Sequence, residues 1–454
     1  MIPDTNRLIL HTVAILGILG LGFRASPAVA QMAPWQQPPG ANRSDRNSLP
    51  EGDGTSAPAV SNLDGPDRSP TPWTGEDHEQ ESGALGLPRG VMSDLLYESV
   101  HDRFWVRADF LGWWTKGFAT PPLLTTSPTG TIASEAGVLG APGTSVVLGG
   151  KDLSGGFRPG ERLTLGAWLN GCQSVGIEAS YFQINPQTNF FNASGASIPI
   201  LARPFSNSET GFQDSQIVNY PGQQSGVFSS AVASDLQAAE VLIRKNLSRQ
   251  PDVAVDFLAG YRYQQLEDHL AVDDTLTFSG TQAAFPAGSI VQQSDRFDTR
   301  NVFQGGVVGL STTFQRQGWS LETLLKLGIG QTHSRVAIDG STTTSIPGQA
   351  ATTLPGGLLA LPSNIGVYDS NRFSAVPELG VTLGFDLSPQ LRATIGYDLL
   401  YWNSVARPGD QIDLNLDPRQ FPPAAGTSAT QPAFHLQTSD YWAQGLNLGL
   451  DLRF

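Results

Sequence analysis

Tyr441-Trp-Ala-Gln-Gly-Leu-Asn-Leu-Gly-Leu-Asp-Leu-Arg-Phe454 alternates between apolar and polar side chains up to the last residue of the sequence. One parity holds Trp442, Leu446, Leu448, Leu450, Leu452 and Phe454, and the other holds Asn447, Gly449, Asp451 and Arg453. Such a period of two predicts a β-strand with two different faces. An apolar face beside charged residues suits a strand with lipid on one side and a polar lumen on the other. A soluble β-sandwich is the alternative, although a soluble sheet rarely ends on so apolar a face.

The N-terminal segment predicts export. Arg7 precedes the apolar stretch 8–23, and Ala28-Val-Ala30 stands before Gln31. This is the pattern of a secretory signal peptide with a small-residue cleavage site, so we assign residues 1–30 to it. No Cys follows the site, so we expect no lipid anchor. No other stretch is long and apolar enough for a membrane helix, so the mature chain can span a membrane only as a β-barrel.

Composition narrows the possible partners. The net charge is -14, and no basic stripe is present to neutralise phosphates, so nucleic acid is excluded as a partner. Cys172 is alone and cannot form an intramolecular disulfide. Residues 31–98 are rich in Pro, Gly, Ser and acids and lack periodic apolar residues, which predicts a disordered acidic periplasmic arm. We interpret the acidic run 76–81 as a solvated charge cluster, and we expect no cofactor.

Residues 99–454 show strand patterns separated by turn residues. The predicted strands cover 104–116, 161–171, 174–185, 235–247, 252–266, 298–315, 318–334, 372–387, 390–404 and 440–454. Short turns (170–174, 248–252, 315–318, 387–390) alternate with long loops (117–160, 186–234, 267–297, 335–371, 405–439). This predicts an all-β, membrane-spanning antiparallel up-and-down β-barrel with short periplasmic turns and long extracellular loops. We expect about ten strands; eight or twelve are alternatives, because loops 117–160 and 267–297 could each hold one more.

Charged residues in these strands share the parity opposite to the apolar one, which places them in the lumen. The candidate lumen charges are Arg107, Asp109, Glu240, Arg244, Asp256, Arg262, Glu322, Lys326, Arg392 and Asp398. Acids and bases nearly balance, so we expect them to form ion pairs across the lumen. In these pairs Arg392 and Lys326 would be the partners of Asp398 and Glu322. An ion pathway is the alternative to such a plug, but open channels belong to larger barrels. Aromatic girdles are expected at the strand ends from Trp105, Trp113, Trp168, Trp319, Tyr401, Trp402, Tyr441 and Trp442.

Two resemblances support this fold. The last strand resembles the terminal-Phe assembly signal of bacterial outer-membrane β-barrels; this implies that outer-membrane lipid and the barrel-assembly machinery are partners. The residues that carry this signal are Trp442, Leu448, Leu450, Leu452 and Phe454. Segments 104–117, 121–128 and 157–169 together resemble the Putative beta barrel porin-7 family, over about residues 104–454. That resemblance implies a porin in the cell outer membrane and assigns no catalytic or binding residues.

Two loops offer other chemistry. His269 lies within the acidic run 267–274, which loosely resembles the acid-and-His rim of ten-stranded outer-membrane proteases. Acid–base hydrolysis would require His269 to hydrogen-bond a carboxylate; a solvated acidic loop is the alternative. Residues 410–417 space their acids like the start of a calcium loop but lack the Gly and Glu that such a loop requires. We expect an extended ribbon there and no metal.

The sequence therefore favours an outer-membrane β-barrel with a structural or surface-exposed role and at most a narrow, charge-lined lumen. One alternative is a porin for passive diffusion of small solutes. The other is a surface hydrolase built around His269. No catalytic residue is assigned to the favoured function, and the sequence does not indicate an oligomeric state.

Overall fold

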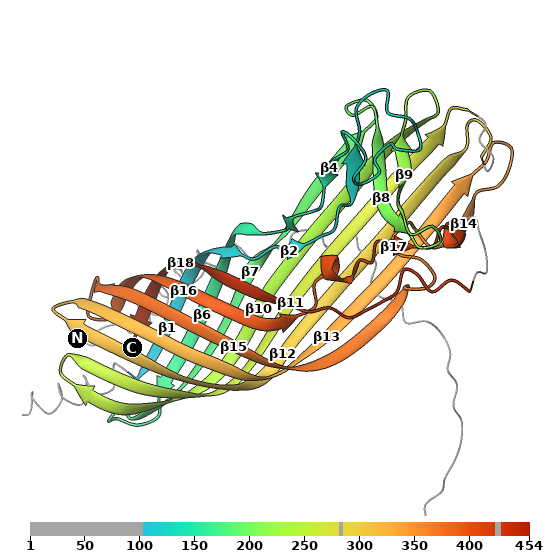
Figure 1. Ribbon diagram of the computed structural model, residues 1–454. Helices are drawn as coiled ribbons and strands as arrows, with labels where there is room; N and C mark the ends of the chain where they lie inside the picture. The colour runs from blue at the N-terminus through green and yellow to red at the C-terminus, as the bar shows by residue number, and fades with distance from the viewer. Residues whose placement is uncertain (1–102, 281–284, 423–427) are drawn as a thin grey trace, which may run out of the picture. The chain divides into compact units, whose positions relative to one another are not determined.

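The computed structural model describes residues 103–280, 285–422 and 428–454 (Figure 1). The signal peptide predicted for residues 1–30 and the arm predicted for 31–98 lie outside the described residues. Within them the chain is all-β, with eighteen strands and two short 3-10 helices. The described residues include no helix long and apolar enough to cross a membrane.

Ten of the strands are long and form one antiparallel sheet. They are β1 (Phe104–Thr115), β6 (Gly156–Trp168), β7 (Val175–Ser194), β10 (Gln224–Gln250), β11 (Val253–Phe278), β12 (Ile290–Arg316), β13 (Trp319–Ser345), β15 (Gly366–Asp386), β16 (Leu391–Val405) and β18 (Ser439–Arg453). Their order is β12-β11-β10-β7-β6-β1-β18-β16-β15-β13, and β12 also pairs with β13. Each long strand therefore has two antiparallel neighbours, and we call this arrangement the ring (Figure 1).

The first and last strands of the ring are hydrogen-bonded to each other. β1 pairs with β18 from Trp105 opposite Arg453 to Thr115 opposite Ala443. Phe104 and Phe454 exchange two backbone hydrogen bonds of 2.8 and 2.9 Å, and their rings stack with centroids 5.9 Å apart. The C-terminal strand thus completes the sheet instead of leaving an open edge.

The expectation of about ten strands is wrong for the total, because the long loops contain eight further strands. They are β2 (Phe118–Ala119), β3 (Leu124–Thr126), β4 (Ser145–Leu148), β5 (Asp152–Leu153), β8 (Leu201–Asn207), β9 (Gln213–Asn219), β14 (Thr352–Pro355) and β17 (Asn415–Leu416); the 3-10 helices are η2 (Pro408–Gln411) and η3 (Pro418–Gln420). Six of these strands have two to four residues and are too short to show a period of two, and the seven-residue strands β8 and β9 do not alternate. The ten predicted segments coincide with parts of the ten long strands.

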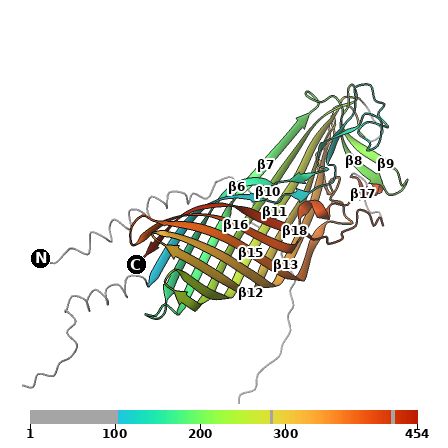
Figure 2. The same cartoon turned by 60° about the vertical axis from the view of Figure 1, so that its left-hand side comes forward.

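Several predicted loops are instead continuations of strands. β10, β12 and β13 have 27 residues each and β11 has 26, so they run well beyond their predicted ends (Figures 1 and 2). The acidic run 267–274 is part of β11, with Glu267 and His269 facing outward while Leu270 and Val272 are fully buried. In this part of the sheet most inward-facing residues are apolar, the reverse of the pattern in the ring near the short turns, and the inward acids Asp268 and Asp274 are buried among them. The continuation was therefore not predicted, because alternation alone does not tell whether the apolar face points to lipid or to the interior.

Near the short turns the outer face of the ring is an apolar band. Its exposed residues include Phe110, Trp114, Leu163, Leu165, Ile177, Val241, Ile243, Phe257, Val308, Leu310, Leu325, Leu327, Leu379, Val381, Ile395, Leu448 and Leu450. A tyrosine–glutamine belt follows on the long-loop side, where Tyr261 donates to Gln304 at 3.3 Å and Tyr397 donates to Gln444 at 3.1 Å. The predicted girdle is wrong for Trp113, Trp402 and Tyr441, which are fully buried inside the ring.

Candidate functional site

The candidate site is the interior of the ring, where all ten predicted lumen charges lie on inward-facing positions. Most of them line a polar cavity of about 450 Å³ that reaches the turn residues 250–252, at the short-turn end. Eight acids and eight bases are among its lining residues, so the cavity has no net preference for an anion or a cation.

Four of these residues form one ion-pair cluster. Glu240 lies opposite Arg262 on neighbouring strands, and Lys326 lies opposite Glu378. Lys326 Nζ then joins the two pairs, with 2.5 Å to Glu240 Oε1 and 3.0 Å to Glu378 Oε1, while Arg262 contacts both carboxylates. All four side chains are at most 7% exposed, so the removal of one would leave a buried charge without its partner.

Glycine makes room for this cluster on the strand between the two pairs. Gly309 faces inward on β12, opposite Lys326. A Cβ at Gly309 would lie 2.8 Å from Lys326 Cγ, too close for the lysine to keep its path. The absence of a side chain here lets Lys326 reach across the lumen.

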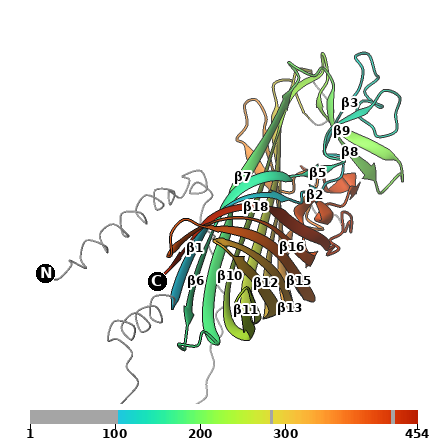
Figure 3. The same cartoon turned by 90° about the vertical axis from the view of Figure 1, so that its left-hand side faces the viewer.

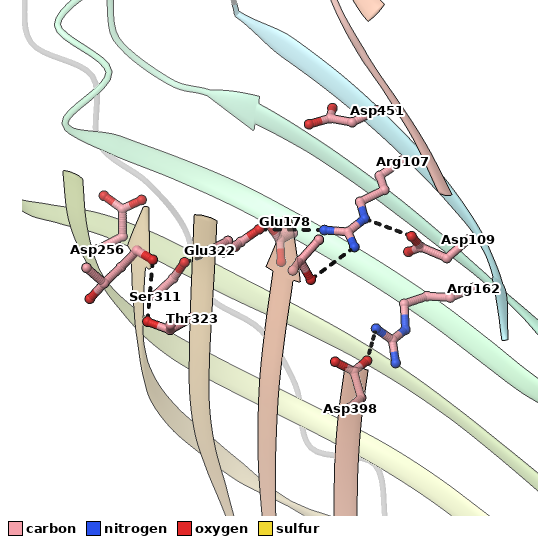
Figure 4. Close-up of polar contacts among 12 residues, drawn as sticks. Arg107, Asp109, Arg162, Glu178, Asp256, Ser311, Glu322, Thr323, Asp398 and Asp451 are labelled. Atoms are coloured by element: carbon pink, nitrogen blue, oxygen red, sulfur yellow. Dashed lines mark hydrogen bonds and ion pairs between the residues drawn. The ribbon is translucent and has the colours of Figure 1, made fainter. Parts of the chain in front are cut away.

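The remaining lumen charges pair differently from the expectation. Asp398 pairs with Arg162 at 2.7 Å, and Glu322 lies 3.5 Å from Arg107, which also contacts Asp109 at 2.9 Å (Figure 4). Arg392 pairs with Asp386 at 2.6 Å. Arg244 contacts Asp256 and Glu178, each at 2.9 Å. The prediction that Arg392 and Lys326 are the ion-pair partners of Asp398 and Glu322 is therefore wrong. The parity of a residue shows which face of the strand it lies on, but not its level along the barrel axis in a tilted strand.

Beyond the charges, on the long-loop side, a cluster of apolar side chains packs in the interior, together with buried polar residues such as Arg158, Thr332 and Asn447. We call this set the apolar layer: Leu111, Trp113, Phe182, Ile184, Leu236, Ala238, Leu266, Phe303, Val376, Leu400, Trp402, Val405, Tyr441 and Ala443. The layer draws on eight of the ten ring strands, and its members are at most 7% exposed. This layer was not predicted from the sequence, although Leu236 and Leu266 share the inward parity of the charges Glu240 and Arg262 on their strands.

Glycines and buried indoles explain how the apolar layer fills the ring. β6 and β13 contribute no residue to the apolar layer. Each carries a glycine at the level of the layer, and a large side chain from a neighbouring strand occupies the space beside it. A Cβ at Gly160 of β6 would lie 2.8 Å from Ile184 Cδ1, and one at Gly328 of β13 would lie 3.3 Å from the Phe303 ring. Trp113 Nε1 donates to Asn447 Oδ1 at 2.7 Å, and Trp402 Nε1 donates to Thr332 Oγ1 at 2.9 Å. The indoles are therefore buried without an unmet donor.

The loops pack against the inner face of the long strands on the far side of the apolar layer. A second apolar cluster joins loop residues such as Leu124, Phe205 and Leu358 to strand residues such as Leu270 and Phe297. Figure 3 shows β3, β8 and β9 in this region, apart from the ring near the short turns.

Buried charges anchor these loops. Arg203 of β8 contacts Asp274 at 2.8 Å and Asp295 at 2.6 Å, and all three side chains are at most 1% exposed. Asp295 Oδ1 also accepts the backbone N–H groups of Leu358, Leu359 and Ala360 at 2.8–3.0 Å. Burial, with Asp295 nearby, raises the pKa of Asp274 to about 6 despite the attraction of Arg203.

A second anchor holds the segment that follows β16. Arg407 pairs with Asp268 at 2.7 Å, and its guanidinium lies 5.1 Å from the Phe118 ring centroid and 5.2 Å from that of Tyr441. Asn301 is hydrogen-bonded to both the N–H and the C=O of Ala406, at 2.7 and 2.8 Å. The loops are thus fixed to the wall by buried polar contacts as well as by apolar packing.

His269 does meet a carboxylate, but on the outer surface. Its Nδ1 lies 2.9 Å from Asp298 Oδ1 on the neighbouring strand, and its side chain is 41% exposed. The pair faces away from the interior, because the adjacent residues Asp268 and Leu270 are the buried ones. The pair lies on an exposed wall, and His269 does not line the cavity inside the ring.

The acids of the 410–417 segment are engaged with protein groups. Asp410 accepts from Ser439, Asp413 accepts the N–H groups of Asn415 and Ala433, and Asp417 pairs with Arg419. No cluster of three or more potential metal ligands occurs among the described residues.

A ring of antiparallel strands with an apolar outer band and a charged interior is typical of a porin-like outer-membrane β-barrel. A family model described as Putative beta barrel porin-7 (BBP7) matches residues 105–454, and the chain belongs to this family. The resemblance seen in the sequence is thereby confirmed.

Solved structures with some likeness to this chain include the following three. The outer membrane protease OmpT from Escherichia coli has 8% identity and a TM-score of 0.36, over 78% of this chain and 97% of that one. A FadL homologue from Pseudomonas aeruginosa has 9% identity and a TM-score of 0.20, over 78% and 90%. The toluene transporter TodX from Pseudomonas putida has 7% identity and a TM-score of 0.18, over 78% and 89%. These TM-scores are low, so none of the activities in those names is inferred for this chain. No relative was found among curated proteins.

Proposed function

We propose that this protein is a membrane-spanning outer-membrane barrel whose lumen is closed to solutes, and that its role is structural or surface-exposed rather than that of a diffusion pore. The observation that carries the proposal is the apolar layer, which lies across the interior between the charged cavity and the loops. The family supports the outer-membrane location.

The apolar band supports the placement in the membrane. Charges on a lipid-facing surface cost about 2–4 kcal/mol near the bilayer midplane. Residues such as Leu325, Leu379 and Leu448 face outward in the band, while Lys326, Glu378 and Asn447 next to them in the chain are buried inside. The tyrosine–glutamine belt then lies at the level expected for the outer interface, where amphipathic aromatic residues gather.

The interior supports the closure. An ion can enter the charged cavity from the short-turn end, but it must lose its hydration water to cross the apolar layer. Hydrophobic constrictions block conduction by dewetting. The ion pairs of the cavity add a second obstacle, because Lys326 and Arg262 already satisfy Glu240 and Glu378. We also propose that the protein is not an enzyme, since the His269–Asp298 pair lies on the exposed outer wall.

Planar-bilayer recording tests the proposal. The purified, unmodified protein is expected to give small or rare conductance steps. A variant with Leu236→Ser, Leu266→Ser and Leu400→Ser should leak more, because hydroxyl groups let water enter the layer. The control variant Thr164→Ala and Thr313→Ala changes two cavity residues outside the layer and should not leak. Heat-modifiable gel migration identifies the folded fraction of each variant. Frequent, porin-sized steps from the unmodified protein would refute closure and favour the porin alternative.

A further inference from the structure

We propose that the buried cluster of Arg203, Asp274 and Asp295 is a pH-sensitive anchor for the loop strand β8. It holds β8 against the wall while Asp274 carries a proton, and it opens more often when Asp274 is ionised. The cluster joins three segments, with Arg203 on β8, Asp274 on β11 and Asp295 on β12. We call these three residues the β8 anchor. They lie on the long-loop side, outside the apolar band.

The β8 anchor contains two carboxyl groups but a single guanidinium. Arg203 contacts both acids, and none of the three side chains is more than 1% exposed. Asp273, the neighbouring charge on β11, is also an acid and pairs with Arg296 on the outer face. On β10 the residue opposite Asp274 is the apolar Phe228. With both acids ionised the anchor would bury a net negative charge, and a buried carboxylate without its own counter-charge takes up a proton instead.

The hydrogen bonds indicate which of the two acids takes the proton. Asp295 Oδ1 accepts three backbone N–H groups from 358–360 and its Oδ2 accepts from Arg203, so both of its oxygens have donors. Asp274 Oδ2 accepts from Arg203, but its Oδ1 is buried without a hydrogen-bond partner among the described residues. Gln293 lies directly opposite Asp274 on β12, and its Oε1 is buried without a partner as well. A proton on Asp274 supplies the donor that these two oxygens lack, and it requires no cavity.

The direction of the pKa shift agrees with this geometry. Burial raises the pKa of Asp274 to about 6, and the nearby acids Asp295 and Asp273 add to the rise against the attraction of Arg203. When the anchor opens and Asp274 meets water, its pKa returns to 3.8. The closed form is therefore fully favoured by protonation below pH 3.8, and this preference is lost as the pH rises through 6. With these two pKa values the ratio of open to closed anchor rises about tenfold between pH 5 and pH 8.

Opening of the anchor would act on the loops and leave the ring unchanged. β8 is hydrogen-bonded to β3, β9 and β17, so it connects the other strands of the loop sheet (Figure 3). Arg203 is the charged residue in the buried run 201–205 of β8. The apolar packing of Leu201 and Phe205 does not depend on pH. We therefore expect more frequent opening of β8 above pH 6, and not its detachment.

The test is amide exchange of the full-length protein in lipid vesicles at pH 5 and pH 8, corrected for the intrinsic effect of pH on exchange. We expect opening of 201–207 to increase about tenfold between the two pH values, while β1 and β18 show no such increase. Asp274→Asn keeps a neutral side chain of the same shape, so in this variant 201–207 should open equally at both pH values. The matched control Asp273→Asn removes the neighbouring exposed acid and should retain most of the increase.

Infrared difference spectra between the same pH values detect the proton itself, because a protonated carboxyl group has a C=O stretching band that a carboxylate lacks. We expect a carboxyl band that titrates near pH 6 in the unmodified protein and in Asp273→Asn, and that is lost in Asp274→Asn. Equal opening of 201–207 at both pH values in the unmodified protein would overturn the proposal, whether or not the variants fold. So would an increase that persists in Asp274→Asn, or a carboxyl band that this variant retains. None of these readouts depends on conductance, so the β8 anchor and the closed lumen can fail separately.

Discussion

Replacing Leu400 and Leu325 by alanine, one at a time, distinguishes a packed interior from a lipid-facing surface with the same chemical change. Each substitution removes three carbon atoms, worth about 2 kcal/mol of transfer free energy at about 0.8 kcal/mol per methylene. Leu400 is fully buried in the apolar layer, whereas Leu325 is 52% exposed on the outer band. A cavity at Leu400 adds to the cost, so Leu400→Ala should lower the free energy of unfolding by about 3–5 kcal/mol. At Leu325 lipid chains fill the space, so the cost should remain near 2 kcal/mol.

The assay is reversible urea unfolding in lipid vesicles, followed by tryptophan fluorescence and by gel migration of unheated samples. Extrapolation to zero urea gives the free energy of unfolding, and an unchanged slope shows that the same surface is exposed in each variant. The expected difference between the two variants is about 1–3 kcal/mol. Equal costs, or a larger cost at Leu325, would mean that Leu400 does not belong to a close-packed layer. The apolar layer would then not be packed closely enough to close the lumen.

Four further outcomes are expected. Lys326→Met leaves Glu240 and Glu378 to share Arg262, so it should lower the free energy of unfolding by about 3–5 kcal/mol, measured by the same urea assay. In the folded protein the pKa of Asp274 is raised to about 6 from 3.8. Protonation of Asp274 therefore contributes fully to the free energy of unfolding below pH 3.8, and this contribution is lost as the pH rises through 6. Unfolding from pH 3.5 to 7 should show this loss, at most about 3 kcal/mol, and Asp274→Asn should flatten it. Phe454→Ser should reduce insertion into the outer membrane, because the last strand pairs with the first; normal levels in fractionated membranes would contradict this. Removal of residues 31–98 should leave heat-modifiable gel migration unchanged, since that segment lacks a hydrophobic period.

The part of the fold that faces lipid was predictable because one physical rule governs it. In β18, Leu446, Leu448 and Leu450 are exposed, while Asn447 and Asp451 are buried at 1% and 9%, as their alternation predicts. Outside the band both faces change their surroundings, since water lies outside and packed loops lie inside. The same alternation in Leu270 and Val272 then has the opposite meaning, and only knowledge of where the lipid ends can reveal it.

The sequence predicts which charged residues lie inside the ring, but not which of them form ion pairs with one another. Parity places Asp398 and Glu322 inside the ring, yet their partners Arg162 and Arg107 come from strands that are not their neighbours. Such contacts depend on strand tilt and on the shift of each strand along its neighbour, which a single sequence does not encode locally. The short loop strands and the Arg203 anchor are set by long-range packing for the same reason.

The length of the ring strands sets how far from the lipid the loops are held. β13 has 27 residues, of which 319–329 belong to the apolar band. The 16 that remain rise about 3.3 Å each, and at a tilt near 40° they extend about 40 Å from the lipid surface. Strands β10 to β13 stay paired over this height, so the loops packed on their inner face are held by a continuous part of the sheet. With the ring placed in the membrane as proposed above, a molecule approaching the cell would meet these loops well clear of the lipid headgroups.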